Sequence, residues 1–276
     1  MKYALLDSGN QRKLERFGKH LLVRPCAQAL WEPELPEKEW AAADATFTRE
    51  VENRWVSKKP LPESWVTELG GLKFKTAPTD FGHLGLFPEH SLFWPWMDEQ
   101  IKSRPAGVRV LNLFAYSGGA TLAAARAGAA VCHLDASQGM VSWARENAAL
   151  NQLSGAPIRW IVDDVLKFLQ REEKRNSRYE GIILDPPSFG RGKQGEVFKI
   201  ERDLLLILDK CRAVLSDKPL FVIFTTHTPG MTPIVMKQLM EQFMKNGVIE
   251  AGEMVLPSES KKTVPSGSYA RWSCGK

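Results

Sequence analysis

The fold is decided by the stretch Val108-Arg109-Val110-Leu111-Asn112-Leu113-Phe114, which continues through Tyr116-Ser117-Gly118-Gly119 into the alanine-rich residues 120–127. A near-continuous apolar run of this length is typical of a strand that is buried on both faces of a parallel sheet. The glycines mark a turn, and the alanines after them favour a helix. The stretch therefore predicts a strand, a tight turn and a helix in direct succession.

The same alternation continues to about residue 246. Strands are predicted at 130–135, 158–162, 180–185 and 219–225, and helices are predicted after them at 137–151, 164–174, 197–215 and 231–246. Such alternation is typical of βαβ units that build a doubly wound parallel α/β sheet. Two final strand candidates, Val248–Leu256 and Ser268–Cys274, have only a turn-rich segment between them. They predict an antiparallel hairpin at one edge of the sheet.

Residues 1–90 have a different character, and the chain's 276 residues leave room for a small module before a larger domain. Short strand-like runs and prolines predict a small β-rich module, and a glycine-bearing loop at residues 80–90 places its boundary near residue 90. Five of the nine tryptophans precede residue 95. Tryptophans in a small module more often form its core than a base-stacking surface, although both interpretations stay open. Residues 91–276 are then the predicted Rossmann-like domain.

Composition and charge limit the classes of protein. With 43% apolar and 25% charged residues, the chain resembles a globular protein, and no apolar run approaches the length of a membrane-spanning helix. No secretory signal is evident, and the four cysteines form no CxxC pair, which predicts a cytoplasmic protein without a disulfide framework or metal site. The net charge is +5, and six Lys or Arg face only two acids within residues 1–30. A polyanionic partner or an ordinary solvated surface would both fit.

Acidic residues end three of the predicted strands, and the carboxyl ends of parallel strands are where an open sheet binds ligands. Asp135 can accept hydrogen bonds from both hydroxyls of a ribose, and Ser137 is the better candidate to cap the following helix. Asp163 and Asp164 can accept from an adenine amine or cap the next helix. At Gly118, backbone N–H groups can approach a ligand, although a plain tight turn fits equally well.

The fourth strand ends in Asp185-Pro186-Pro187-Ser188-Phe189, the most specific signal in the chain. The two prolines restrict the loop, so that an acid and an aromatic ring are held with little entropy to lose. This combination suits a planar substrate that stacks on Phe189 while Asp185 accepts hydrogen bonds from its edge. A merely rigid turn is the alternative.

Together, the run from Asn112 to Gly119, Asp135-Ala136-Ser137, Asp163-Asp164-Val165 and the Asp185 loop resemble class I S-adenosylmethionine-dependent methyltransferases, specifically those that modify large-subunit (23S) ribosomal RNA. The resemblance covers roughly residues 80–276. It implies a seven-stranded sheet that ends in an antiparallel hairpin, S-adenosyl-L-methionine as the cofactor, and ribosomal RNA as the partner. The preceding module resembles the small β-rich domain that precedes the catalytic fold in that group, and RNA binding is the role considered for it. Relatives often carry an extra N-terminal RNA-binding domain, for which residues 1–90 leave no room beside the β-rich module.

The resemblance assigns roles to individual residues. The Gly118 turn would hold the methionine part of the cofactor, Asp135 the ribose and Asp164 the adenine, while the segment beginning Phe87-Pro88 would close over it. The full set of expected cofactor-binding residues is Phe87, Pro88, Asn112, Phe114, Ala115, Tyr116, Ser117, Gly118, Asp135, Ala136, Ser137, Asp163, Asp164 and Val165. The expected catalytic residues are Asp185, Pro186, Pro187, Ser188 and Phe189.

One departure from the family bears on the atom that is methylated. Relatives that methylate carbon 5 of cytosine carry a cysteine nucleophile after the fifth strand, where this chain has Thr225-Thr226-His227-Thr228. A nitrogen of an RNA base is therefore the expected acceptor. His227 is either incidental or positions the substrate. The alternative functions are methylation of a small molecule or a protein side chain, and a non-catalytic RNA-binding module that keeps the fold.

Overall fold

The computed structural model describes residues 1–49, 53–104, 107–191 and 197–275, which form two compact units. The first unit comprises Met1–Glu89 and Val255–Ser266, and the second comprises His90–Met254 and Gly267–Lys276. The segment Val255–Ser266 thus groups with residues that lie far from it in the chain, which residue order alone does not indicate.

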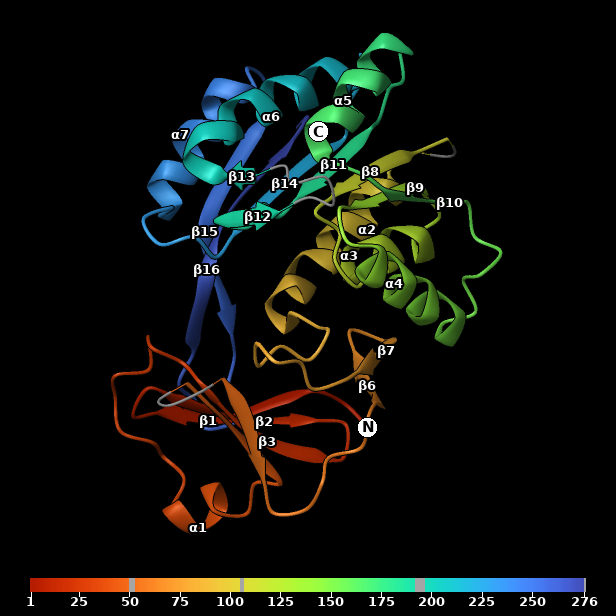
Figure 1. The fold of residues 1–276 in the computed structure, drawn as a ribbon. Coiled ribbons are helices and arrows are strands. Elements are labelled where there is room, and N and C mark those ends of the chain that lie inside the picture. The colour runs from red at the N-terminus through yellow and green to blue at the C-terminus, as the bar shows by residue number, and fades with distance from the viewer. Residues whose placement is uncertain (50–52, 105–106, 192–196, 276) are drawn as a thin grey trace. The chain divides into compact units, whose positions relative to one another are not determined.

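The first unit is rich in β-structure (Figure 1). A five-stranded sheet has the order β1-β2-β3-β4-β5, and a separate hairpin pairs β6 with β7. The strands are β1 (Ala4–Gly9), β2 (Arg12–Phe17), β3 (His20–Pro25), β4 (Ala45–Thr48), β5 (Arg54–Ser57), β6 (Trp65–Leu69) and β7 (Leu72–Thr76), and the short helix α1 is Glu37–Trp40. Strand β3 pairs with β4 in parallel, and the other neighbouring strands are antiparallel.

The tryptophans of this unit support its core. Trp40 and Trp65 are buried, and the indole N–H groups of Trp31, Trp40, Trp55 and Trp65 all donate hydrogen bonds to acceptors within the unit. Buried indoles need such partners. These four rings therefore have the structural role that was the stronger of the two sequence-based interpretations.

Part of the basic charge in this unit is neutralised internally. Arg24 donates two hydrogen bonds to the fully buried carboxylate of Glu15, over 2.7 and 2.8 Å, and the Lys13 ammonium lies 3.3 Å from the same carboxylate. A charge can be buried when it is paired and hydrogen-bonded in this way. Arg12 and Arg16 remain more exposed, although each lies near one acid, Glu37 or Glu259.

The second unit contains a seven-stranded sheet with the order β10-β9-β8-β11-β14-β16-β15. The strands are β8 (Arg109–Leu113), β9 (Ala130–Asp135), β10 (Ile158–Val162), β11 (Gly181–Leu184), β14 (Phe221–Thr226), β15 (Val248–Leu256) and β16 (Val264–Ser273). The first five of these are parallel, and β16 pairs with β14 in the antiparallel direction. This arrangement confirms the predicted doubly wound sheet with an antiparallel hairpin at one edge.

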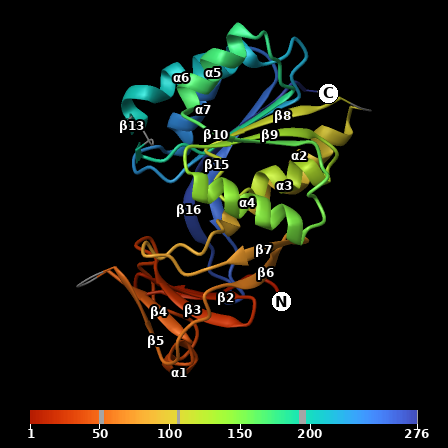
Figure 2. The same ribbon diagram turned by 45° about the vertical axis from the view of Figure 1, so that its right-hand side comes forward.

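Helices cover both faces of this sheet. The helices are α2 (Trp94–Lys102), α3 (Gly119–Arg126), α4 (Gln138–Leu150), α5 (Val165–Lys174), α6 (Ile200–Val214) and α7 (Pro233–Phe243). Figures 1 and 2 show α5, α6 and α7 on one face and α2, α3 and α4 on the other. Apolar residues of the first group, such as Phe168, Ile207 and Met236, pack with Leu111 and Val222 of the strands in one core. None of the helices in the described ranges is long and apolar enough to cross a membrane.

Local sequence explains where several helices begin. The hydroxyl of Ser137 accepts from the Met140 backbone N–H at the start of α4, Asp164 caps α5 in the same way, and Thr232 caps α7. Each cap satisfies a backbone N–H that has no partner within its helix. The predicted capping by Ser137 is confirmed.

Three local predictions were wrong. Residues 197–199 form the short strand β13 (Val197–Lys199), which pairs with β12 (Phe189–Arg191), so α6 begins at Ile200 rather than at 197. No helix was predicted at residues 94–102, where α2 lies with Pro95 in its first turn, a position in which proline is well tolerated. The last strand begins at Val264, before the predicted Ser268.

Candidate active site

The order of the strands identifies the carboxyl ends of two central strands as the place for a ligand. The chain builds β8, β9 and β10 outward in one direction and then continues with β11 on the other side of β8. The carboxyl ends of β8 and β11 therefore flank the switch point, where open α/β sheets bind ligands. Phe114–Gly118 follow β8, and Asp185–Phe189 follow β11.

The turn after β8 has an unusual backbone. Phe114 and Tyr116 have positive φ angles of 55° and 50°, and Gly118 has a φ of 89°. Left-handed residues other than glycine are strained, and such strain gathers at functional sites. The buried Asn147 amide of α4 holds the turn by donating to the Ser117 carbonyl over 2.9 Å.

The glycine at 118 is required by packing as well as by φ. A Cβ at this position would lie 3.0 Å from the Cβ of Ala144 on α4. Helix α3 begins at Gly119, with Gly118 as its N-cap residue. A tight turn that leads into a helix N-terminus exposes backbone N–H groups to a polar ligand.

Asp135 fastens this turn to the neighbouring strand. Its Oδ2 accepts from the Tyr116 N–H over 2.9 Å, and its Oδ1 accepts from the Ser137 N–H over 2.8 Å. Burial raises the pKa of Asp135 above its ordinary value, although the two backbone hydrogen bonds act in the opposite direction. The sequence suggested a carboxylate without partners in the protein, whereas both of its oxygens accept backbone hydrogen bonds. Each oxygen keeps a lone pair for a ligand hydroxyl.

The two acids after β10 have different surroundings. Asp164 Oδ1 caps α5 through the Lys167 N–H over 2.9 Å, whereas Asp163 accepts from the Asp164 N–H and forms an ion pair with Arg171. Capping, the stronger of the two interpretations, is thus present at Asp164. Contact of Asp163, Asp164 and Val165 with a cofactor stays a prediction, as it does for Ala136, which is exposed.

Asn112, also expected near the cofactor, points into a buried chain of hydrogen bonds. Its amide donates to the Thr121 hydroxyl over 2.9 Å, and that hydroxyl lies 2.9 Å from His133 Nδ1. Burial lowers the pKa of His133 to about 3, and Arg145 acts in the same direction. Asn112 therefore links β8, α3 and β9 beneath the turn, which the sequence did not reveal.

The loop after β11 combines an anchored half with an exposed half. Pro186 is buried, its carbonyl accepts from Thr226, and the Ser188 hydroxyl lies 2.9 Å from that of Thr228. Pro187 and Ser188 are exposed, and the Phe189 side chain is 48% exposed. A fixed backbone that presents an aromatic ring is suited to stacking against a planar group.

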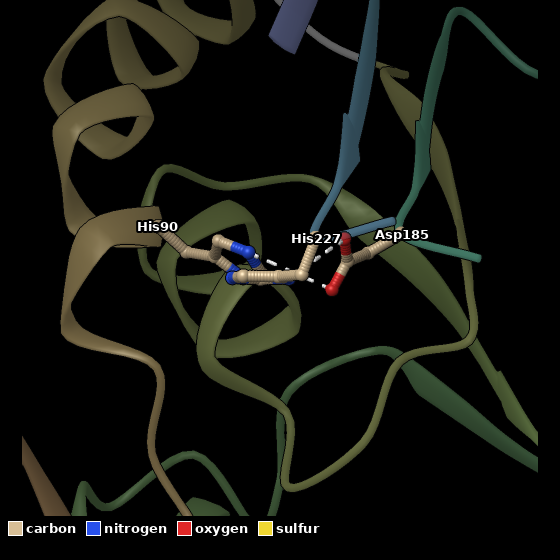
Figure 3. A group of neighbouring side chains, drawn as sticks. All are labelled: His90, Asp185 and His227. Carbon is tan, nitrogen blue, oxygen red and sulfur yellow. Dashed lines mark ion pairs between the residues drawn. The ribbon is translucent and has the colours of Figure 1, made fainter. Parts of the chain in front are cut away.

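Asp185 lies beside two histidines that the sequence did not connect with it. Figure 3 shows the imidazoles of His90 and His227 next to each other, with the Asp185 carboxylate directed toward them. His90 Nε2 lies 3.6 Å from Asp185 Oδ2, and His227 Nδ1 lies 4.0 Å from Asp185 Oδ1. The buried Thr225 hydroxyl donates to Asp185 Oδ1 over 2.9 Å and orients the carboxylate. His227 is therefore part of a cluster rather than an isolated loop histidine.

Phe87 and Pro88 belong to the first unit, and Pro88 starts a 3-10 helix, η1 (Pro88–Phe93), that also carries His90. Their contact with the cofactor stays a prediction. Within the sequence, the only signal for His90 was its place directly after Phe87-Pro88-Glu89, in the segment already expected near the cofactor.

Residues 41–233 match the family described as S-adenosylmethionine-dependent methyltransferase. The chain belongs to this family. A solved S-adenosylmethionine-dependent methyltransferase from Agrobacterium tumefaciens is 42% identical, with a TM-score of 0.94 over 99% of this chain and 91% of that one. A putative methyltransferase, SMU.776, solved in complex with SAH, shares the fold at 20% identity, with a TM-score of 0.75 over 98% of this chain and 75% of that one.

Curated relatives of this methyltransferase match over a shorter stretch. The ribosomal RNA large subunit methyltransferase K/L of Shewanella frigidimarina is 39% identical over 140 residues, which is 50% of this chain and 19% of the relative. The protein of the same name from Hahella chejuensis is 38% identical over 148 residues, or 53% and 20% of the two chains. The matched stretch thus spans about a fifth of the length of these relatives.

The residues at the switch point fit the cofactor of this family. Asp135 and Asp164 end adjacent strands beside the Gly118 turn, and both keep unused carboxylate lone pairs after their backbone hydrogen bonds. Carboxylates at these two strand ends can accept from the ribose hydroxyls and the adenine amine. S-adenosyl-L-methionine is the cofactor, and contact of Asp135 and Asp164 with it stays a prediction.

Proposed function

We propose that this methyltransferase transfers a methyl group to a nitrogen atom of a base in ribosomal RNA. The observation that carries the proposal is the Asp185–Phe189 loop at the switch point, which holds an exposed aromatic ring four residues after an oriented carboxylate. The names of the curated relatives support ribosomal RNA as the substrate class. A cytoplasmic location, where ribosomal RNA is modified in bacteria, is part of the proposal.

The thiols favour nitrogen over carbon as the acceptor. Burial raises the pKa of Cys26, of Cys211 and of Cys132, in the last case to about 11. Attack on carbon 6 of a pyrimidine needs a thiolate, which a raised pKa disfavours. Cys274, the exposed cysteine, follows the last strand. It lies neither in the loop after β11 nor in the loop after β14.

Transfer to nitrogen asks the protein for alignment rather than for covalent catalysis. When bound, S-adenosylmethionine supplies a methyl group activated by its sulfonium charge. In the proposed reaction, the bond from nitrogen to the methyl carbon forms as the bond from sulfur to that carbon breaks, and the electron pair of the broken bond stays on sulfur. The positive charge passes to the base, and a nitrogen that carries hydrogen then gives its proton to Asp185 or to water. Phe189 would hold the base plane and Asp185 would accept from its edge, so that the nucleophilic lone pair faces the methyl carbon.

The test is transfer of labelled methyl groups to deproteinised ribosomal RNA from cells that lack the gene. Stacking of a base on an aromatic ring contributes roughly 1–3 kcal/mol, so Phe189→Ala should lower the second-order rate constant about five- to a hundredfold. Asp185→Ala should lower it more, while both variants keep their affinity for S-adenosylhomocysteine within a few fold. Leu205→Ala, at a side chain 57% exposed on α6, is the matched control and should leave the rate unchanged.

Three outcomes would contradict the proposal. Label that enters protein or small molecules but not RNA would assign another substrate, and the absence of any transfer would favour a non-catalytic RNA-binding module. Full activity in both loop variants would remove Asp185 and Phe189 from the site.

We also assign contact with RNA to the module of residues 1–90, whose basic excess lies within residues 1–30, and methyl transfer to residues 91–276. Arg12 and Arg16 are the basic residues to test, because their side chains are 39% and 43% exposed, whereas Arg24 is buried against Glu15. Replacing both by Ala should reduce the slope of log RNA affinity against log salt concentration by about two, as expected for the loss of two phosphate contacts. An unaltered salt dependence would show that Arg12 and Arg16 belong to an ordinary solvated surface.

A further inference from the structure

We propose that His90, Asp185 and His227 form a binding site for one divalent transition-metal ion of the zinc type. The three residues come from η1, from the end of β11 and from the end of β14, and all belong to the second unit. One ligand atom from each residue lies within 4.8 Å of those of the other two. Metal binding is measured without RNA, so the proposal does not rest on the identity of the methylated substrate.

The distances fit an ion better than direct hydrogen bonds. The separations between each histidine and the carboxylate, 3.6 and 4.0 Å, exceed the 2.7–3.2 Å that is usual for a hydrogen bond from nitrogen to oxygen. In a tetrahedral site with bonds of about 2.1 Å, ligand atoms lie roughly 3.4 Å apart. The pair of His90 and Asp185 is within a few tenths of an ångström of this separation, and the whole set, which lies within 4.8 Å, would enclose an ion after shifts of up to about 1 Å.

The chemistry of the three donors selects the class of ion. Two imidazole nitrogens with one carboxylate oxygen form a donor set that suits Zn²⁺, Co²⁺, Ni²⁺ or Fe²⁺, whereas Mg²⁺ and Ca²⁺ prefer oxygen ligands. Three protein ligands leave at least one position open for water or another donor, as in catalytic rather than structural zinc sites. The carboxylate would also compensate half of the ion's charge.

The surroundings of Asp185 are those of an oriented ligand. Thr225 is buried and donates to Asp185 Oδ1 over 2.9 Å, which leaves Oδ2 facing His90. Metal-binding carboxylates are commonly held by such hydrogen bonds from outside the ligand set. The side chains of His90 and Asp185 are 20% and 23% exposed and that of His227 is 36% exposed, so the site is open to an ion from the side of His227.

The sequence could not reveal this site, because its ligands lie on three separate segments without any recognised spacing. The cysteine pattern predicted no metal site. The topology brings the residues together by placing β11 beside β14 in the sheet.

The test is titration of the chelator-treated full-length protein, saturated with S-adenosylhomocysteine, with Zn²⁺ by calorimetry and with Co²⁺ by visible absorption. We expect one ion per chain. His90→Ala and His227→Ala, which each remove a ligand, should lower the affinity for Zn²⁺ by at least about tenfold. Thr225→Val should lower it by about tenfold or more, because a group that orients a ligand contributes on this scale. His83→Ala and Cys274→Ser, which remove an exposed histidine and an exposed thiol outside the cluster, are the matched controls.

Retained affinity for S-adenosylhomocysteine and an unchanged melting temperature would show that a variant is folded. Should an alanine variant fail this check, His90→Gln or His227→Gln keeps the side-chain volume and replaces it. Failure of the folded wild-type protein to bind one ion would overturn the proposal. So would binding that the His90 and His227 variants leave unchanged, because the ion would then lie elsewhere.

Discussion

At the scale of single residues, Asp135 combines a structural role with a predicted role in cofactor binding. It ties the strained turn to β9 through the Tyr116 and Ser137 N–H groups, and it is the residue that would bind the ribose of the cofactor. Removal of a charge-assisted hydrogen bond costs about 1.5–3 kcal/mol. Asp135→Ala should therefore weaken S-adenosylhomocysteine binding about tenfold or more in calorimetry.

Asp209→Asn serves as the control for this variant, because Asp209 is exposed and paired with Arg212 on α6. Its affinity for S-adenosylhomocysteine should equal that of the wild type. Unchanged binding in Asp135→Ala would exclude Asp135 from the cofactor site.

Gly118 offers a second test at this scale, because two separate constraints act on it. Its φ of 89° costs any other L-residue about 1–2 kcal/mol, and an added Cβ would also approach Ala144 to 3.0 Å. Gly128 has a φ of 102° but nothing within 4 Å of an added Cβ. In urea unfolding, Gly118→Ala should therefore lose more stability than Gly128→Ala. Equal losses would mean that the contact with α4 adds nothing.

At the scale of elements, β8, α3 and β9 are joined by the buried chain of Asn112, Thr121 and His133. Because burial holds the pKa of His133 near 3 while the unfolded chain has about 6.5, the unfolded state takes up a proton first as the pH falls. The stability that depends on neutral His133 is complete above about pH 6.5 and is lost progressively between pH 6.5 and 3.

The expected size of this effect can be measured in urea. Between pH 7.5 and 5.5, protonation of the unfolded chain at this residue should lower the free energy of unfolding by about 1.4 kcal/mol. His133→Asn, which does not titrate, should remove that part of the decrease and leave the smaller part due to His20, whose pKa burial also lowers. An identical pH dependence in the variant would show that His133 does not control stability in this range.

Elements were also the level at which the sequence was most informative. Every strand of the large sheet was predicted, because continuous apolar runs bounded by turn residues have few other interpretations. The two-stranded ribbon of β12 and β13 was not predicted, because strands of three residues carry no periodic signal. The cluster around Asp185 was not predicted for a different reason. Sheet order brings Asp185 and His227 together and η1 adds His90, and a residue pattern does not encode either placement.

At the scale of the whole molecule, the chain combines a methyltransferase sheet, whose strands end in the acids predicted to bind the cofactor, with a β-rich unit. Of the candidate site, the acids at the strand ends and the Asp185 loop could be predicted, because each motif is contiguous in the chain. The hydrogen bonds that fix those acids, and the two histidines beside Asp185, required the structure.

The central claim is that this protein methylates a nitrogen of a base in ribosomal RNA. The most direct measurement is mass spectrometry of nucleosides from the ribosomal RNA of cells with the gene, without it, and with the gene restored as wild type or as Asp185→Ala. We predict that one nitrogen-methylated nucleoside disappears with the gene, returns with the wild type, and does not return with the variant. Identical nucleoside profiles in all four strains, or loss of a carbon-methylated nucleoside instead, would contradict the claim.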